Sequence, residues 1–322
     1  MKTHFSLILC LLLVLSAASC VTEDVERNTR AGNFDALWRT LDERYCFFAE
    51  KGEAYGLDWN EVYARYRPAV TEQMNAYQLF DVMGRMLAEL RDGHVNLYAP
   101  HDVARYGAWF DDFPANFNDS LARRYLGRTE DYRTTAGMQY RVLDDHTGYL
   151  RVSSFEYPIG DGNLHEVMAY LGTCQRLIVD VRSNGGGLLT GGYMCHKTGP
   201  AHTAFSQREP ISIEPFVGLR WQKPVYVLTN RRTYSAANSF VMFLKGLPHV
   251  TVVGDRTGGG AGMPLHYELP NGWSVRFSAC PMFDREGRLT EMGIDPDLHV
   301  DLSEADAARG IDTLIEAARH QP

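Results

Sequence analysis

The segment 177–187, Leu-Ile-Val-Asp-Val-Arg-Ser-Asn-Gly-Gly-Gly, decides the fold class. Its mostly apolar first half predicts a buried strand over 177–181. The three glycines that follow allow positive φ angles and let the backbone approach a ligand closely, with N–H groups free to face an anion. By themselves they are equally consistent with a tight turn from a strand to a helix. No Gly-Lys-Ser/Thr sequence follows, so the segment is not a nucleotide-binding P-loop.

The flanking sequence continues this pattern of strands and helices. Strands are predicted at 149–152, 225–228 and 250–253, and helices at 164–171, 235–247 and 305–318. Asn271-Gly272 lies between two alternating runs, 265–269 and 273–277, which is typical of a β-hairpin. Strands that alternate with helices predict an α/β core with parallel strands.

The N-terminal third has helical periodicity instead. An apolar stripe runs from Phe34 to Phe48 after Asn33, which we interpret as an N-cap. Asp58 with Glu61 has the spacing of a capping box. A third stripe, 79–90, precedes Asp92-Gly93, where we expect the helices to end.

We therefore divide the body of the chain into three parts. Residues 33–99 form a helical N-terminal domain, 100–146 an irregular connecting region, and 147–322 the α/β core. The interval between His94 and Gly148 is too short for a PDZ domain of ordinary size, so we expect none.

The first twenty residues predict export. Lys2 and the apolar run 5–15 suit a signal peptide and are too short for a spanning helix. The small residues 16–19 before Cys20 resemble a bacterial lipobox, which implies a signal peptide over 1–19 and a lipid-anchored tether over 20–32. The expected location is the periplasmic or cell-surface side of a bacterial membrane. The alternative is an ordinary signal peptide cleaved near Ser19.

Composition narrows the classes of partner. With 40 acidic and 32 basic residues the net charge is −8, and no basic block occurs, which argues against nucleic acid as a partner. Four cysteines remain beyond Cys20, and their wide spacing is not that of a disulfide framework or a zinc site. We expect buried thiols, with a Cys174–Cys195 bridge left open. With no HExxH motif and no cysteine pair, neither a metal nor an organic cofactor is expected.

Two further residues could carry chemistry. Ser235 follows a strand and opens a helix, where a serine is usually an N-cap. It could instead be a nucleophile, placed where the helix dipole and the Ala236 N–H assist a developing oxyanion. His94 follows the third helix and could simply cap that helix or be exposed.

Taken in order, these segments resemble the tail-specific and tricorn-type serine peptidases. The resemblance covers nearly the whole mature chain and rests on five segments, 90–94, 177–187, 227–237, 254–259 and 291–297. It implies a core of the crotonase and ClpP kind. It also implies serine-type hydrolysis of peptide bonds through an acyl-enzyme.

The departures from the family indicate the branch. One branch uses a Ser–Lys dyad, but Gly260 stands at the position of that lysine. The other candidates are Lys223 and Lys245, and Lys245 lies about 15 Å from Ser235 along the helix. In the tricorn branch a His at the position of His94 is the base. A serine that precedes this His is replaced here by Gly93.

The resemblance thus implies that Ser235 is the nucleophile, His94 the general base and then acid, and Glu291 the residue that orients His94. The N–H groups of Gly186 and Ala236 would form the oxyanion hole, with Gly185 or Gly187 as alternatives to Gly186. A His base predicts an acidic limb of kcat/KM near pH 6–7, raised somewhat by Glu291.

The expected activity is that of a lipid-anchored serine endopeptidase on peptides or proteins. One alternative is an inactive peptide- or glycan-binding lipoprotein on a peptidase core. A crotonase-like acyl-CoA enzyme is another, although the export signal argues against it.

Overall fold

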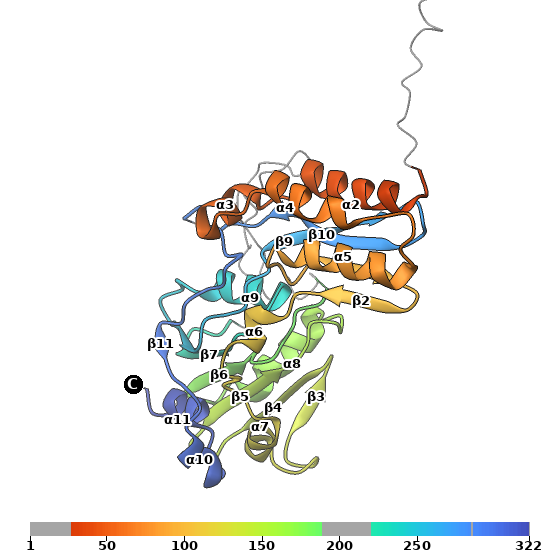
Figure 1. Cartoon of the computed structure of the whole chain (residues 1–322). Coiled ribbons are helices and arrows are strands. Elements are labelled where there is room, and N and C mark those ends of the chain that lie inside the picture. The colour runs from red at the N-terminus through yellow and green to blue at the C-terminus, as the bar shows by residue number, and fades with distance from the viewer. Residues whose placement is uncertain (1–26, 189–219, 285, 322) are drawn as a thin grey trace, which may run out of the picture.

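The computed structural model describes residues 27–188, 220–284 and 286–321 (Figure 1). The predicted signal peptide, Cys20 and Cys195 lie outside these residues, and so does most of the tether. In the described part, Cys174 is a buried free thiol. None of the helices described is long and apolar enough to cross a membrane.

The α/β core is a seven-stranded sheet in the order β11-β8-β7-β6-β5-β4-β3. Its strands are β3 (Arg133–Thr135), β4 (Met138–Val142), β5 (Thr147–Val152), β6 (Arg176–Asp180), β7 (Val225–Thr229), β8 (Val250–Gly254) and β11 (Leu298–His299). The neighbours from β5 to β11 pair in parallel, which confirms the expected parallel core, whereas β3, β4 and β5 pair antiparallel. Every residue of β5 and β7 is buried, because helices and loops cover both faces of a parallel sheet.

Among the described residues, three longer helices and three short ones surround this sheet. They are α6 (Ala108–Asp111), α7 (Asp119–Leu126), α8 (Asp161–Leu171), α9 (Ala236–Leu244), α10 (Glu304–Ala308) and α11 (Thr313–Arg319). The prediction of a single closing helix over 305–318 is therefore wrong, because α10 and α11 are two separate helices. Gly310 adopts φ +78°, which breaks the helical path between α10 and α11.

The N-terminal helices pack on a second, four-stranded antiparallel sheet (Figure 1). The helices are α2 (Arg30–Arg44), α3 (Phe48–Tyr55), α4 (Trp59–Tyr66), the 3₁₀ turn η1 (Arg67–Ala69) and α5 (Ala76–Ala88). The sheet order is β2-β1-β10-β9, with β1 (Asn96–Ala99), β2 (Asp102–Arg105), β9 (Gly262–Glu268) and β10 (Ser274–Pro281). The hairpin predicted around Asn271-Gly272 is thus confirmed, and it joins the helical layer.

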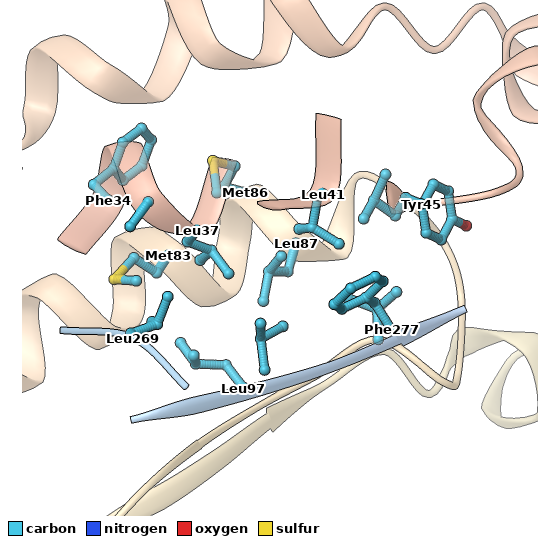
Figure 2. Close-up of a cluster of buried hydrophobic side chains, with 14 of the residues drawn as sticks. Phe34, Leu37, Leu41, Tyr45, Met83, Met86, Leu87, Leu97, Leu269 and Phe277 are labelled. Carbon is cyan, nitrogen blue, oxygen red and sulfur yellow. The ribbon is translucent and has the colours of Figure 1, made fainter. Parts of the chain in front are cut away.

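Figure 2 shows the core between these helices and strands. Phe34, Leu37 and Leu41 on α2 face Leu97 on β1 and Phe277 on β10, and all five are essentially without solvent exposure. Burying side chains of this size contributes about 1.5–3 kcal/mol each. Since the hairpin comes from the C-terminal half of the chain, this core joins that half to the N-terminal helices.

Several local expectations in the first half of the chain are wrong. Helix α2 is capped by Thr29, whose side chain accepts from the Gly32 N–H, whereas Asn33 is buried inside the helix. The helix ends at Arg44 and does not continue to Phe48. The segment 100–146 is not irregular, because β2, α6, α7, β3 and β4 lie within it.

As expected, no PDZ domain lies between His94 and Gly148, an interval that the structure describes throughout.

A buried ion cluster fixes the turn that follows β6. Arg182 has no solvent-exposed side-chain surface and donates to Asp180 at 2.6 and 2.9 Å and to Asp312 at 2.9 Å. Tyr149 also donates to Asp180, at 2.8 Å. Because a buried charge without its partners is costly, this cluster holds the chain rigidly just before Asn184 and the three glycines.

Candidate active site

Ser235 lies at a strained turn between β7 and α9. Its φ of +57° and ψ of −121° are unusual for a residue with a side chain. Although it occupies the N-cap position, its side chain makes no capping hydrogen bond. Its hydroxyl is therefore not committed to the helix, which removes the simple capping interpretation.

Hydrogen bonds to two other segments, 181–184 and the loop with Gly259, hold this turn. The Ser235 N–H donates to the Gly259 carbonyl at 2.9 Å, and the Tyr234 N–H donates to the Asn184 carbonyl at 3.0 Å. The Thr233 hydroxyl donates to the Val181 carbonyl at 3.0 Å. The strain at Ser235 persists because these bonds fix the residues before it and helix α9 begins directly after it.

His94 reaches Ser235 from the helical side of the molecule. Its Nε2 lies 2.9 Å from Ser235 Oγ, although the two residues are 141 positions apart in sequence. The His94 N–H donates to Asp92 Oδ1 at 2.7 Å. The ring of Tyr234 packs edge-on against the imidazole, with 5.0 Å between centroids. Backbone and ring are thus both held in position.

Burial gives His94 a different acidity from the one expected. Only 2% of the residue is exposed, and burial lowers the pKa of the imidazole to about 4, against the opposing charge of Asp92. The charge of Arg276 lowers the pKa further. The expectation of a value near 6–7, raised by Glu291, is therefore wrong, because desolvation of the cation outweighs the nearby carboxylate.

Glu291 makes its hydrogen bonds with other residues and not with His94. Its Oε2 accepts from the Ala261 N–H at 2.9 Å, and its Oε1 lies 3.2 Å from Lys51 Nζ. The Nδ1 of His94 is buried and has no hydrogen-bond partner among the described residues. The backbone of Gly262 raises the pKa of the imidazole, but it does not form a hydrogen bond with Nδ1. The expected Glu291–His94 hydrogen bond is thus not present in this structure.

Lys51 and Asp92 set the electrostatics of Glu291. Burial, together with the charge of Asp92, raises the pKa of Glu291 to about 8, while Lys51 acts in the opposite direction. Asp92 accepts a hydrogen bond from Tyr45 at 3.0 Å. Two buried carboxylates therefore act on each other here, and Lys51 pairs with one of them, Glu291.

The glycine turn lies against Ser235, but one expected donor is engaged. A Cβ on Gly186 would come within 2.8 Å of Ser235 Cβ and of the Ala236 nitrogen, and its φ is +96°. The Gly186 N–H donates to Asn184 Oδ1 at 2.9 Å, so it is not free for an oxyanion. Gly187 pairs with Phe155 as an isolated parallel bridge. Ala236 begins helix α9, and the first N–H groups of a helix have no acceptor within it.

Aromatic rings lie against Gly260 and Gly93, the two positions where the resemblance implied a lysine and a serine in other peptidases of this kind. A Cβ on Gly260 would lie 2.4 Å from the Tyr234 ring, and one on Gly93 would lie 2.5 Å from Trp109 Nε1. The rings of Trp109 and Tyr234 stack with 4.0 Å between centroids. Neither the dyad lysine nor the extra serine could be accommodated without moving these rings.

The two lysines considered from the sequence are engaged elsewhere. Lys223 Nζ donates to the carbonyls of Gly172 and Cys174, and Lys245 Nζ donates to Asp297 at 2.6 Å. The lysine that does lie beside the site, Lys51, was missed. Its signal is weak: Phe47, Lys51 and Tyr55 are spaced by four, so a lysine falls between two aromatic residues on one helical face.

Comparison with known proteins agrees with this architecture. Residues 146–300 match peptidase family S41, and residues 26–88 match the C1 domain of tricorn protease. A solved protein from Parabacteroides merdae, described as a candidate peptidase, is 45% identical, with a TM-score of 0.83 over 91% of this chain and 96% of that one. The chain belongs to peptidase family S41, a family of serine-type hydrolases that act on peptides.

More distant structures share the fold alone. A lipoprotein from Streptococcus agalactiae is 16% identical, with a TM-score of 0.53 over 91% of this chain and all of that one. Mature CPAF is 11% identical, with a TM-score of 0.65 over 90% of this chain and 95% of that one.

Proposed function

We propose that this protein is an active serine endopeptidase in which Ser235 is the nucleophile and His94 the base. The observation that carries the proposal is the 2.9 Å separation of His94 Nε2 and Ser235 Oγ at a strained turn where the hydroxyl caps nothing. A serine hydroxyl is a weak nucleophile, and an adjacent neutral imidazole activates it. This His belongs to the tricorn-like branch of the family.

The chemistry then follows acyl transfer. His94 takes the hydroxyl proton while Ser235 Oγ bonds to the scissile carbonyl carbon, and the resulting imidazolium returns that proton to the departing amine. Water, deprotonated by His94, releases the acyl group and restores the hydroxyl. The low pKa of His94 keeps the base neutral at ordinary pH. The cost is a less stable imidazolium, which nearby negative charge offsets.

The oxyanion donors in this proposal are the N–H groups of Ala236 and Gly187. The Gly186 N–H, the first choice from the sequence, already has Asn184 as its acceptor. Around Gly187, the Gly186 carbonyl and the Leu188 N–H bond to Phe155, so the Gly187 N–H points to the other side of the strand. Each oxyanion donor typically contributes about 3–4 kcal/mol.

A fluorophosphonate probe tests the proposal. The purified protein should be labelled, and peptide mapping should find the adduct on Ser235 alone. Profiling of new peptide ends in a protein digest should then reveal internal cleavage. A folded protein that reacts with no probe and cuts no peptide would favour the inactive peptide- or glycan-binding lipoprotein.

We further propose that Cys20 is the acylated N-terminus that anchors the protein to the outside of a bacterial membrane. The small residues before Cys20 support this, and the polar stretch up to Thr29 would serve as the tether. Replacing Cys20 by alanine should move the exported protein from the membrane fraction to the soluble one, measured by fractionation and immunoblot. Unchanged membrane association of an exported Cys20→Ala protein would rule out the lipid anchor.

A further inference from the structure

Helix α3 sends two side chains toward the chain segment that carries His94. Lys51 and Tyr55 are four residues apart and therefore share a face of the helix. The Tyr55 hydroxyl donates to the Leu90 carbonyl at 2.8 Å, and Lys51 Nζ donates to the Arg91 carbonyl at 3.1 Å. These carbonyls follow the end of α5, where backbone acceptors have no helical partner.

The segment so held is strained and leads directly into His94. Arg91 adopts φ +46°, which is uncommon for a residue other than glycine. Its guanidinium lies over the Tyr55 ring, 4.3 Å from the centroid. Asp92 follows and accepts the N–H of His94. The position of the imidazole thus depends on contacts that α3 makes with Leu90 and Arg91, four and three residues before His94.

Lys51 also holds the opposite side of the site. Its Nζ lies 3.2 Å from Glu291 Oε1, and the side chains of the pair are only 1% and 3% exposed. One ammonium group therefore connects the His94 segment to the loop that carries Glu291. A lysine so completely buried is rare unless it is paired, and here it has two partners.

We infer that Lys51 is a positioning residue for the proposed peptidase, which fixes the His94 segment and keeps Glu291 available as an anion behind it. This inference rests on the proposed function and extends it. The helical layer is then part of the active site. The carboxylate would stabilise the imidazolium that forms during attack, through charge and without a direct hydrogen bond.

The inference predicts a second step in the pH profile. Among the described residues, the charges that act on Glu291 are those of Lys51 and Asp92. Four uncharged groups lie around them, and burial raises the pKa of each: Tyr45, Cys46, Tyr55 and Tyr234. Since the pKa of Glu291 is about 8, labelling of Ser235 should accelerate as pH rises through that value. Removing the Lys51 charge should move this step to higher pH.

The test compares Lys51→Met with Lys51→Arg and with Lys223→Met. Lys223 is the control, because its Nζ donates to the backbone carbonyls of Gly172 and Cys174, as Lys51 donates to that of Arg91, but it pairs with no carboxylate among the described residues and lies beside the C-terminal end of α8. At pH 7.5, Lys51→Met should lower the second-order rate of fluorophosphonate labelling roughly thirtyfold, a typical coupling between contacting residues. Lys51→Arg should recover most of the rate, and Lys223→Met should leave it unchanged.

A double-mutant cycle separates positioning from folding. In a Glu291→Gln background, Lys51→Met removes a second charge and leaves no unpaired carboxylate at Glu291, so the protein should remain folded. The further loss of rate should shrink to a few-fold, and the upper pH step should be absent. An equal loss in both backgrounds would overturn the inference, because Lys51 would then act independently of Glu291.

A readout that needs no activity separates this inference from the proposed function. The imidazole resonances of His94 in an NMR spectrum should shift in Lys51→Met and keep their positions in Lys223→Met. If they shift while the wild-type protein reacts with no probe, the positioning role stands and the peptidase assignment fails. If they do not shift, Lys51 does not position His94, whatever the activity.

Discussion

Peptide hydrolysis by the Ser235→Ala variant should fall roughly a millionfold, the scale of loss when another serine protease loses its nucleophile. Without the hydroxyl no acyl-enzyme can form, and only substrate binding and the oxyanion donors remain. The measurement is kcat on a peptide that the wild-type protein cleaves, with fluorophosphonate labelling as a second readout.

The variant should keep its fold, so that the loss can be assigned to chemistry. Ser235 has no capping bond to lose, and alanine has the same Cβ at the same strained φ. The thermal midpoint should therefore change by no more than a few degrees, since only the bond to His94 disappears. Residual hydrolysis above a hundredth of the wild-type rate would show that Ser235 is not the nucleophile.

Replacing His94 by alanine should reduce kcat by about four orders of magnitude or more. The described residues offer no nearby substitute base, because Lys223 and Lys245 are bonded elsewhere and Lys51 is held by Arg91 and Glu291. Labelling of Ser235 should slow in parallel. His94→Gln is a useful companion variant, since it retains a polar side chain but cannot act as a base at neutral pH.

The pH dependence of kcat/KM in the wild-type protein should also report His94 as the base. The base is active when neutral, so activity is present above the pKa of His94 and is lost as pH falls through it. Because burial lowers that pKa to about 4, the lower limb of kcat/KM should lie near pH 4, distinct from the upper step assigned to Glu291. A single limb at pH 6–7 would indicate a solvated imidazole and contradict the buried geometry of His94.

The amino-acid sequence by itself determined the framework of this protein. Apolar runs at 177–181, 225–228 and 250–253 became parallel strands, because a strand buried on both faces needs a continuous apolar sequence. Asn271-Gly272 closed a hairpin because such a pair readily adopts the required turn. Motif order and spacing also indicated the family and drew attention to Ser235 and His94.

Only the tertiary structure decided how the site is assembled. The 2.9 Å contact between His94 and Ser235 joins segments 141 residues apart, and nothing local encodes it. The acidity of His94 depends on burial, which is a property of the whole packed core and not of its neighbours in sequence. The engagement of the Gly186 N–H by Asn184 likewise follows from one turn geometry among several that three glycines allow. Sequence patterns could not identify Lys51 either, because a lysine in an amphipathic helix is normally solvated. Only the packing of α3 against the His94 segment buries it beside Glu291.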